Sequence, residues 1–525
     1  MDLSKQDLSP EVMEYIKSLE DKKKVLETNY KSLKDQADDL RNKLNIALNS
    51  LFGKSSEKVS PLQPELFEEF TIEALEEVLE ELLIPEHKRA KKGRKPINPS
   101  IPREIIEHDI PEEDKKCACG CDLVKVDEVA TERLQIVPEK VYVERHIRPK
   151  YACRNCEGSG DEEKSVFRIA PAPPSLIPGS IMTGGLLSYI LINKFCDYLP
   201  FYRQEKRFER FGAPISRQNM SNWTIKSYRI LKELNALMKN KIRSGPFLQM
   251  DETTVQVHGE EKKPDSSKSY IWVTKGGPPE SQIALYEYNK SRSSQYIKDF
   301  VEGYSGFLQS DGYQGYDSVL KNHEEIIHVG CLAHARRKIY DAYKTDKKLK
   351  QSNAVINKIQ KIYTEEKKLR QKELTSDQFI LERKETVKPL LDDLKLWLDK
   401  KNLNLRPTSN LGQAVSYTLG QWDKIVKYLE CPFLTPDNNA AERTVKPFVM
   451  GRKNFLFAGS TEGADAMCFY YSLIETAKLN GLNPYAYLKW LFEKAPLLED
   501  RESLESLAPW KLNPEEVNKI MLPSK

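Results

Sequence analysis

The chain has 525 residues, several times the usual size of one domain, so we expect three or four folded units. Lys and Arg total 82 and Asp and Glu total 78, so the net charge of +4 does not by itself indicate a nucleic-acid partner. The first residues show no signal-peptide pattern, and no apolar run reaches the ~18 residues that a membrane span needs. We therefore expect a cytoplasmic protein that does not enter a membrane.

Apolar residues recur from Val12 to Leu51 at alternating steps of four and three, with Lys23 as the one polar member of the series. Two apolar residues per heptad form a stripe too narrow for a globular core face, which favours a coiled coil between subunits over 10–53. The alternative is an amphipathic helix that packs on its own chain. The coiled coil predicts a homo-oligomer.

Charge is segregated within 54–100. Residues 65–86 hold nine Glu and no basic residue, which is typical of an acidic helix, whereas residues 88–95 hold six basic residues and no acidic one. The basic stretch lacks the apolar content to fold alone, so we expect a linker. Its Gly-Arg-Lys-Pro at 93–96 is similar to the core of a minor-groove hook, and a solvated linker is the alternative.

Five of the nine cysteines fall within 117–156. In a reducing compartment such a cluster indicates metal ligation rather than disulfides, and four thiolates suit a closed structural zinc site. We therefore expect a zinc-binding β module over 101–165, with a β-hairpin at 132–151; buried or free thiols are the alternative. Cys331 and His334 also have metal-like spacing, but no second pair lies nearby in the sequence, so we assign them no zinc. The candidate zinc ligands are Cys117, Cys119, Cys153 and Cys156, with Cys121 as the alternative to Cys119.

Residues 180–235 are expected to be helical. Two apolar-periodic segments are separated by Gly-Ala-Pro at 212–214, after which Ser216 is placed to cap the second helix. A helix, a short turn and a second helix fit a helix-turn-helix, although any helical bundle gives the same pattern. In a helix-turn-helix, the residues offered to base edges would be Arg217, Gln218 and Asn219.

From residue 245 the apolar period changes to that of strands. The order is three strands, a helix, a strand, a helix or loop, and a strand that leads into a helix, which predicts an α/β sheet within 245–460. A lysine-rich helical insertion is expected at about 344–430. The remaining C-terminal segment, 461–525, is expected to be helical.

Three acidic residues in this part of the chain could act together. Asp251 and Asp311 each follow an apolar run, which places a carboxylate where a buried strand meets the surface. Asp437 is the expected N-cap of a new helix, so Glu442 lies just over one turn into that helix. Phosphodiester chemistry with two metals needs such acids to converge on cations roughly 3.5 to 4 Å apart, although an Asp at a strand end is more commonly a turn or cap residue. Glu252 should point to the opposite face of its strand from Asp251, so we do not include it.

Several longer segments resemble one known family. "MDETTVQV", "LQSDGYQGYD", "HVGCLAHARRK", "DNNAAERTVKPFVMGRKNFLFAGSTEGA" and "AKLNGLNPYAYLKWL", with "FGKSSEK" and the cysteine pairs upstream, look like the IS-sixty-six type of insertion-sequence transposases. The resemblance extends from about residue 10 to the C-terminus. The family's first cysteine pair is often C-x-x-C, and "CACGC" differs from it, which leaves the choice between Cys119 and Cys121 open.

This resemblance implies a multidomain α/β protein with a ribonuclease-H-like catalytic core. It also implies an Asp-Asp-Glu triad, carried over to Asp251, Asp311 and Glu442, which binds Mg²⁺ or Mn²⁺. The implied activity is cleavage of DNA strands at the ends of an insertion sequence, followed by strand transfer into target DNA.

The implied partners are double-stranded DNA, at the element ends and the target, and small accessory proteins encoded by the same element. The protein would act in the bacterial cytoplasm and on the nucleoid when bound. Two other functions remain open: a DNA-binding regulator without catalysis, and a ribonuclease-H-like nuclease without strand transfer. The candidates for contact with phosphate, for which solvated basic side chains are the alternative, are His334, Arg336, Arg337, Arg443, Lys446, Arg452 and Lys453.

Overall fold

The computed structural model describes residues 141–152, 167–261, 263–345, 350–498 and 502–519, with isolated positions between 18 and 27. The chain divides into two compact units, Glu69–Ile169 and Ala170–Lys525 together with Met1–Glu68. Apart from the isolated positions, the predicted coiled coil, acidic helix and basic linker lie outside the described residues, as do the five clustered cysteines. None of the described helices is long and apolar enough to cross a membrane.

The described part of the smaller unit contains one antiparallel strand pair. β1 (Lys150–Ala152) pairs with β2 (Phe167–Ile169). Residues 141–149 are exposed and form no strand, so the hairpin predicted at 132–151 is wrong for this stretch. Val141, Val143 and Ile147 are exposed there, so their apolar side chains do not form the buried face on which a hairpin is usually stabilised.

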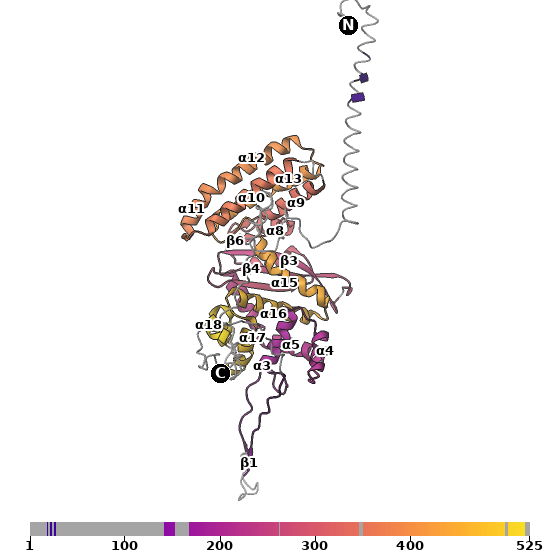
Figure 1. Cartoon of the computed structure of the whole chain (residues 1–525), viewed down its shortest axis with the longest axis vertical. Helices are drawn as coiled ribbons and strands as arrows, with labels where there is room; N and C mark the ends of the chain where they lie inside the picture. Colours follow the sequence, from indigo (N-terminus) through magenta and orange to yellow (C-terminus); the bar gives the residue numbers. More distant parts are fainter. Residues whose placement is uncertain are drawn as a thin grey trace, which may run out of the picture. The chain divides into compact units, whose positions relative to one another are not determined.

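A mixed sheet forms the centre of the larger unit (Figure 1). Its strand order is β5-β4-β3-β6-β7; β4 runs antiparallel to β3 and β5, whereas β6 runs parallel to β3 and β7. The short β8 pairs with the far end of β3. The predicted α/β sheet is therefore present. The strands are β3 (Phe247–Val257), β4 (Lys268–Gly276), β5 (Ile283–Asn289), β6 (Gly306–Gln309), β7 (Ile326–Val329) and β8 (Phe457–Ala458).

Helices cover both faces of this sheet. On one face the Tyr286 hydroxyl of β5 donates a hydrogen bond to the Thr444 carbonyl of α15. On the other face Trp272 of β4 stacks on Tyr296 of α7, with ring centroids 4.6 Å apart. One of the helices around the sheet, α6 (Glu233–Arg243), leads into β3. Those that come after the first strands are α7 (Ser294–Val301), α8 (Gln314–Leu320), α9 (Leu332–Thr345), α15 (Asn439–Phe455), α16 (Thr461–Leu479), α17 (Pro484–Lys494) and α18 (Pro514–Asn518).

The edge strand β5 is covered by α16 rather than by another strand. The backbone amide of Tyr286 donates to the Ser472 hydroxyl at 2.8 Å, and that of Ala284 donates to the Thr476 hydroxyl at 3.2 Å. These bonds satisfy donors that an exposed edge would offer to another chain.

Three further helices precede the sheet: α3 (Gly184–Phe195), α4 (Phe201–Arg210) and α5 (Arg217–Leu231). The predicted N-cap of α5 is confirmed, because the Ser216 hydroxyl accepts the Asn219 backbone amide at 3.2 Å. Between α4 and α5 the chain turns at Gly212, whose φ of 71° suits glycine. α5 packs on α16, where the Ser227 and Tyr470 hydroxyls share a hydrogen bond of 2.5 Å.

The stretch between α9 and α15 is helical and has its own buried core. Apolar side chains from α10, α12 and α13 pack together with residues of β7 and α9. At one end of this core Arg383 is fully buried, and its guanidinium donates to the carbonyls of Tyr428, Cys431 and Leu434 at 2.8 to 3.0 Å and to Glu366 at 3.0 Å. Arg383 thus fixes the loop that leads into α15. The helices are α10 (Lys350–Arg370), α11 (Ser376–Thr386), α12 (Lys388–Asn404), α13 (Asn410–Gly420) and α14 (Trp422–Ile425).

The two central parallel strands share a short sequence, Phe-Leu-Gln-x-Asp, at 247–251 and 307–311. In their register each residue pairs with the identical residue of the other strand, and the last pair is Gln249 with Gln309. The two glutamine side chains also bond to each other, since the Gln249 amide donates to the Gln309 carbonyl oxygen at 2.7 Å. The Gln309 amide in turn donates to the Thr435 carbonyl at 2.9 Å, in the loop before α15. Two strands and one helix start are therefore joined at a single point.

Replacement of Gln309 by Leu should lower the free energy of unfolding by about 2–4 kcal/mol, because it leaves the Gln249 amide and the Thr435 carbonyl without their partner. Urea unfolding of the full chain measures this change. The matched control is Gln413→Leu, which replaces an exposed glutamine of α13 and should shift stability by no more than about 0.5 kcal/mol. Equal effects of the two substitutions would contradict this role of Gln309.

Candidate acidic site

Asp251 lies within β3 rather than at its end. The strand continues to Val257, and Asp251 pairs with Val273 of β4, so the predicted strand-end position is wrong. The reason is that β4 is longer than β6. Pairing with β6 stops at Gln249, whereas pairing with β4 continues without a break to Gln256, and β8 joins β3 only from Gln256. Asp251 is thus placed just past the end of the parallel neighbour.

Asp311 follows β6 by two residues, as Asp251 follows Gln249. Its Oδ1 accepts the backbone amide of Tyr313 at 3.0 Å, which fixes the carboxylate at the turn before α8. The Asp311 side chain is about one quarter exposed. Because the register of the two strands places Asp251 and Asp311 level with each other, both carboxylates belong to the same edge of the sheet.

Glu442 lies in the first turn of α15 and is 6% exposed. The N-cap of α15 is Asn438, and the predicted cap Asp437 precedes it by one residue. Asp437 still takes part, because its Oδ1 accepts the Asn439 amide at 3.0 Å in a local turn. The side chain of Asn438 does not cap the helix, because its amide group donates to the Met250 carbonyl of β3 at 2.9 Å. That bond attaches the start of α15 beside Asp251.

The electrostatics show that the three carboxyls are close enough to influence one another. Burial, together with the charges of Glu252, Glu442 and Asp311, raises the pKa of Asp251 to about 8. Burial likewise raises the pKa of Glu442 to about 7, an effect opposed by Arg337 and increased by Asp437 and Asp311. For both carboxyls, burial outweighs any positive charge nearby.

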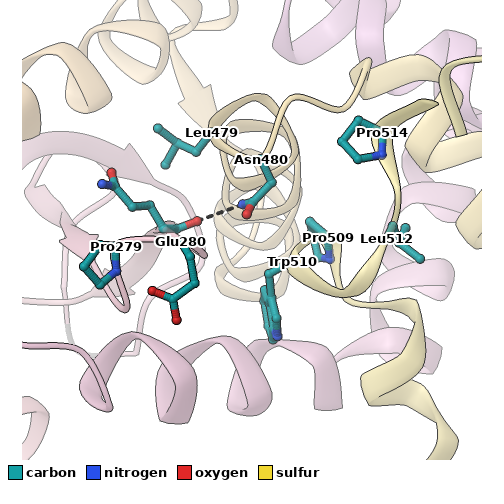
Figure 2. Close-up of a pocket in the computed structure, with 9 residues that line it drawn as sticks. Pro279, Glu280, Leu479, Asn480, Pro509, Trp510, Leu512 and Pro514 are labelled. Carbon is teal, nitrogen blue, oxygen red and sulfur yellow. Dashed lines mark hydrogen bonds between the residues drawn. The ribbon is translucent and has the colours of Figure 1, made fainter. Parts of the chain in front are cut away.

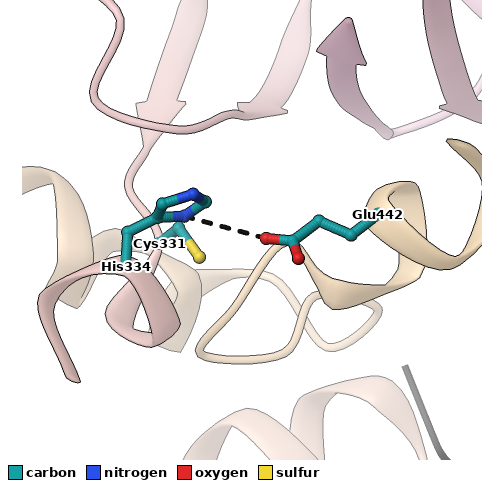
Figure 3. A group of neighbouring side chains, drawn as sticks. All are labelled: Cys331, His334 and Glu442. Atoms are coloured by element: carbon teal, nitrogen blue, oxygen red, sulfur yellow. Dashed lines mark ion pairs between the residues drawn. The ribbon is translucent and has the colours of Figure 1, made fainter. Parts of the chain in front are cut away.

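A sulfur, a nitrogen and an oxygen atom come together at the start of α9. Ligand atoms of Cys331, His334 and Glu442 lie within 4.8 Å of one another, and the His334 ring is turned toward the Glu442 carboxylate (Figure 3). His334 Nδ1 and Glu442 Oε1 are 3.8 Å apart, too far for a hydrogen bond, and neither has a hydrogen-bond partner among the described residues. Burial raises the pKa of the Cys331 thiol, whose sulfur accepts the backbone amide of Asn438 at 3.3 Å. Among the described residues these three ligands come together, one fewer than the four of a closed structural zinc site.

Glu252 lies on the other face of β3 from Asp251, as predicted. Its side chain is 4% exposed and bonds to Arg292, and the Tyr316 hydroxyl of α8 donates to it at 3.5 Å. Trp272, its partner in the register, packs against α7 and α8. Glu252 therefore bonds to Arg292 and Tyr316, on the opposite face of β3 from Asp251.

The basic candidates differ in their surroundings. Arg337 lies 3.6 Å from Glu442, so this arginine rather than Arg443 forms the ion pair with the glutamate. Arg452 donates to the hydroxyls of Thr253 and Thr254 in β3 at 3.1 and 2.9 Å. Of the remaining candidates, Arg443 and Lys453 are exposed and Arg336 and Lys446 are half-buried. Arg217, Gln218 and Asn219 are exposed at the start of α5.

A hollow of about 510 Å³ lies elsewhere in the larger unit, between the β4–β5 connection and the C-terminal segment (Figure 2). Pro279, Trp510 and Pro514 are among its lining residues, and Asn480 donates to the Gln282 carbonyl at its rim at 2.9 Å. Its one lining carboxylate is that of Glu280. The three acids described above do not line it, so this hollow is separate from the acidic site.

Sequence reasoning missed the residues that position the acids. These are Gln249 and Gln309, Asn438, and Arg292, whose guanidinium bonds to Glu252 and lies 4.0 Å from Asp311. The repeated Phe-Leu-Gln-x-Asp was a signal that could have found the glutamines. Arg292 and Asn438 had no comparable signal, because their partners are distant in the sequence.

The comparisons with known proteins point to one family. A family model described as "Transposase IS66 family" matches residues 179–466, more than half of the chain, and one described as "IS66 C-terminal element" matches 472–510. Toward the N-terminus, "zinc-finger binding domain of transposase IS66" matches 114–157 and "Transposase C of IS166 homeodomain" matches 39–106.

Two curated relatives come from Sinorhizobium fredii (strain NBRC 101917 / NGR234), "Uncharacterized protein y4jD" and "Uncharacterized protein y4qI". Each is 30% identical to this chain, over 431 and 447 residues. The alignments cover 79% and 82% of this chain, and 82% and 79% of the relatives.

The raised pKa of Asp251 predicts a pH-dependent stability in the absence of divalent cations. The folded protein holds a proton on Asp251 between about pH 4, the ordinary pKa of Asp, and about pH 8, so the free energy of unfolding should fall as the pH rises through this interval. Between about pH 5 and about pH 8.5, the free energy of unfolding of the wild type should fall by at least about 1.4 kcal/mol more than that of Asp251→Asn. This is the energy that corresponds to one pKa unit. Urea unfolding in a chelator measures both proteins. Parallel pH profiles would contradict the raised pKa.

Proposed function

Because the chain belongs to the IS66 family of DDE transposases, we propose that it cleaves DNA strands at the ends of an insertion sequence and joins them to target DNA. The family resemblance drawn from the sequence is confirmed. The observation that carries the proposal is the convergence of Asp251, Asp311 and Glu442, which come from β3, the β6–α8 turn and α15. We assign these three residues as the catalytic triad.

The architecture supports a ribonuclease-H-like catalytic domain over 245–460. Three antiparallel strands followed by two parallel ones, with helices on both faces, match the order expected for such a core. The helices α10 to α14 would be the insertion at about 344–430, placed before the helix that carries the glutamate. Its buried Arg383 suits a role in fixing the loop before Glu442.

The triad fits Mg²⁺ or Mn²⁺, because these cations prefer carboxylate oxygens and Glu442 Oε1 has no hydrogen-bond partner among the described residues. The raised pKa values of Asp251 and Glu442 also support a cation site, since a bound cation would supply positive charge to these two carboxyls. When bound, such cations would activate the attacking hydroxyl and stabilise the leaving oxygen.

The protein's own groups have separate tasks at this site. Asp251 and Glu442 must lose their protons before they can act as ligands, so ligation is favoured as the pH rises toward 8. Arg337, 3.6 Å from Glu442, favours the ionised glutamate. Asn438 and the Gln249–Gln309 pair hold the two strands and the helix start in fixed register, which orients the carboxylates before DNA arrives.

DNA would be bound by separate basic and polar surfaces. Exposed Arg217, Gln218 and Asn219 at the start of α5 are suited to base edges in a helix-turn-helix-like region over 180–235. The phosphate contacts that we propose around the triad are His334, Arg336, Arg337, Arg443, Lys446, Arg452 and Lys453, of which Arg452 is also tied to β3.

The remaining assignments concern residues outside the described structure. We propose a structural zinc within 101–165, held by Cys117, Cys119, Cys153 and Cys156, with Cys121 as the alternative to Cys119; the zinc-finger family model spans all five. We further propose a coiled coil over 10–53 that joins subunits, an acidic helix and a basic linker over 54–100, and accessory proteins from the same element as partners. Within the described residues, we assign α16, α17 and α18 to a C-terminal helical segment over 461–525.

The test is cleavage and joining of labelled DNA that carries the element ends, in Mg²⁺. Glu442→Gln and Asp251→Asn should each lower the rate of strand cleavage by at least roughly 10²–10³-fold, because each removes a ligand of the cations. Both variants should still bind the ends, since the proposed contacts of Arg217, Gln218 and Asn219 lie outside the triad. The matched control is Glu385→Gln, an exposed glutamate of α11, which should cleave at the wild-type rate.

Full cleavage and joining by Glu442→Gln would overturn the assignment of the triad. Wild-type protein that binds the ends but never nicks them, in Mg²⁺ or Mn²⁺, would favour a DNA-binding regulator. Cleavage without joining of the 3′ end would favour a nuclease.

A further inference from the structure

Arg292 lies beside the acidic site but belongs to none of the groups described as triad or basic candidates. It follows β5 and comes just before Ser293, the N-cap of α7. Because β5 and β3 run in the same direction, on either side of β4, the C-terminal end of β5 and Asp251 share one edge of the sheet. The position of Arg292 in the fold thus brings a fixed cation to the acids.

The guanidinium of Arg292 is anchored by a buried carboxylate. Its Nε donates to Glu252 Oε1 at 2.5 Å, and its Nη2 is paired with the same oxygen. Glu252 is 4% exposed and lies on the α7–α8 face of β3. A charged hydrogen bond to a buried partner restricts the rotation of a long side chain, so the guanidinium is held in one place.

Tyr313 fixes the same side chain from a second direction. The Arg292 guanidinium carbon lies 3.9 Å from the centroid of the Tyr313 ring, a cation–π contact. The Tyr313 hydroxyl also donates to the Arg292 backbone carbonyl at 2.6 Å. Since the Tyr313 amide bonds to Asp311, one residue positions both the arginine and the aspartate.

The distance to Asp311 indicates that Arg292 is not simply its ion-pair partner. Nη2 lies 4.0 Å from Asp311 Oδ2, beyond a direct hydrogen bond, although the arginine side chain is 38% exposed. Arg292 therefore leaves Asp311 Oδ2 available to a cation, whereas Oδ1 accepts the backbone amide of Tyr313. The guanidinium faces solvent next to them, where a phosphate approaching the triad would meet it.

We propose that Arg292 binds a non-bridging oxygen of the DNA phosphate that lies against Asp311, with Glu252 as its positioning residue. This inference rests on the proposed function, since it takes DNA as the ligand. A planar guanidinium that is already oriented loses little freedom when it binds phosphate, which makes arginine better suited to this contact than lysine.

The first experiment measures binding without catalysis, in buffer without divalent cations. Element-end DNA carries a neutral methylphosphonate at one position at a time, and the affinities of wild type and Arg292→Gln are compared in a double-mutant cycle. In the wild type, a methylphosphonate at one position, or at either of two adjacent positions, should weaken DNA binding roughly tenfold. In Arg292→Gln, a methylphosphonate at the same positions should not weaken DNA binding further. The slope of log K against log salt concentration should also decrease by about 0.9, the loss of one phosphate contact.

Controls separate contact from folding. Arg292→Lys keeps the charge but loses the paired geometry, so it should retain part of the coupling, and Arg406→Gln, at an exposed position, should leave the coupled positions unchanged. Glu252→Gln should reduce the coupling severalfold at an unchanged melting temperature. If Glu252→Gln keeps the full coupling, its positioning role is wrong.

The second experiment uses Mn²⁺ binding by the free protein. Arg292→Gln should bind Mn²⁺ as tightly as the wild type or more tightly, because a cation beside Asp311 has been removed, whereas Asp311→Asn should bind it more weakly. If Arg292→Gln loses both Mn²⁺ binding and thermal stability, Arg292 only supports the fold. Additive methylphosphonate effects at every position would likewise overturn the proposal. Because neither readout needs strand cleavage, both remain informative if the proposed transposition fails.

Discussion

The parallel register between β3 and β6 is the constraint on which the acidic site depends. It pairs the Phe, Leu and Gln of two copies of Phe-Leu-Gln-x-Asp, so Asp251 and Asp311, two residues further on, emerge at the same level. A slip of one residue would turn every side chain of one strand to the opposite face and would separate the carboxylates. The buried bond between Gln249 and Gln309 opposes such a slip, because a shifted register would leave two amides without partners.

The third acid is attached to this pair through the loop before α15. Gln309 bonds to Thr435, Asn438 bonds to Met250, and Arg383 of the helical insertion bonds to three carbonyls of 428–434. Each contact joins the loop to a different part of the domain. The insertion thus has a physical connection to the start of the helix that carries Glu442, although it contributes none of the three acids.

Much of this fold could be predicted from the sequence, because strand and helix periods are local properties. The strands at 247–257 and 306–309, the helix of 294–301 and the cap Ser216 follow from apolar alternation and capping chemistry. Positions that depend on partners far along the chain could not be predicted in this way. Asp251 was expected at a strand end because the sequence does not reveal that β3 pairs with β4 over more residues than with β6. The sequence likewise does not reveal that Asn438 rather than Asp437 takes the N-cap position of α15, because the side chain of Asn438 bonds to the distant Met250.

The central claim is that the three carboxylates form one divalent-cation site. The most direct measurement is anomalous X-ray diffraction from crystals of the full chain soaked in Mn²⁺. The account predicts anomalous density in contact with the carboxylates of Asp251, Asp311 and Glu442, and loss of that density in Asp251→Asn. Mn²⁺ bound at Cys331 and His334 without Asp251 and Asp311, or bound only elsewhere on the protein, would contradict it.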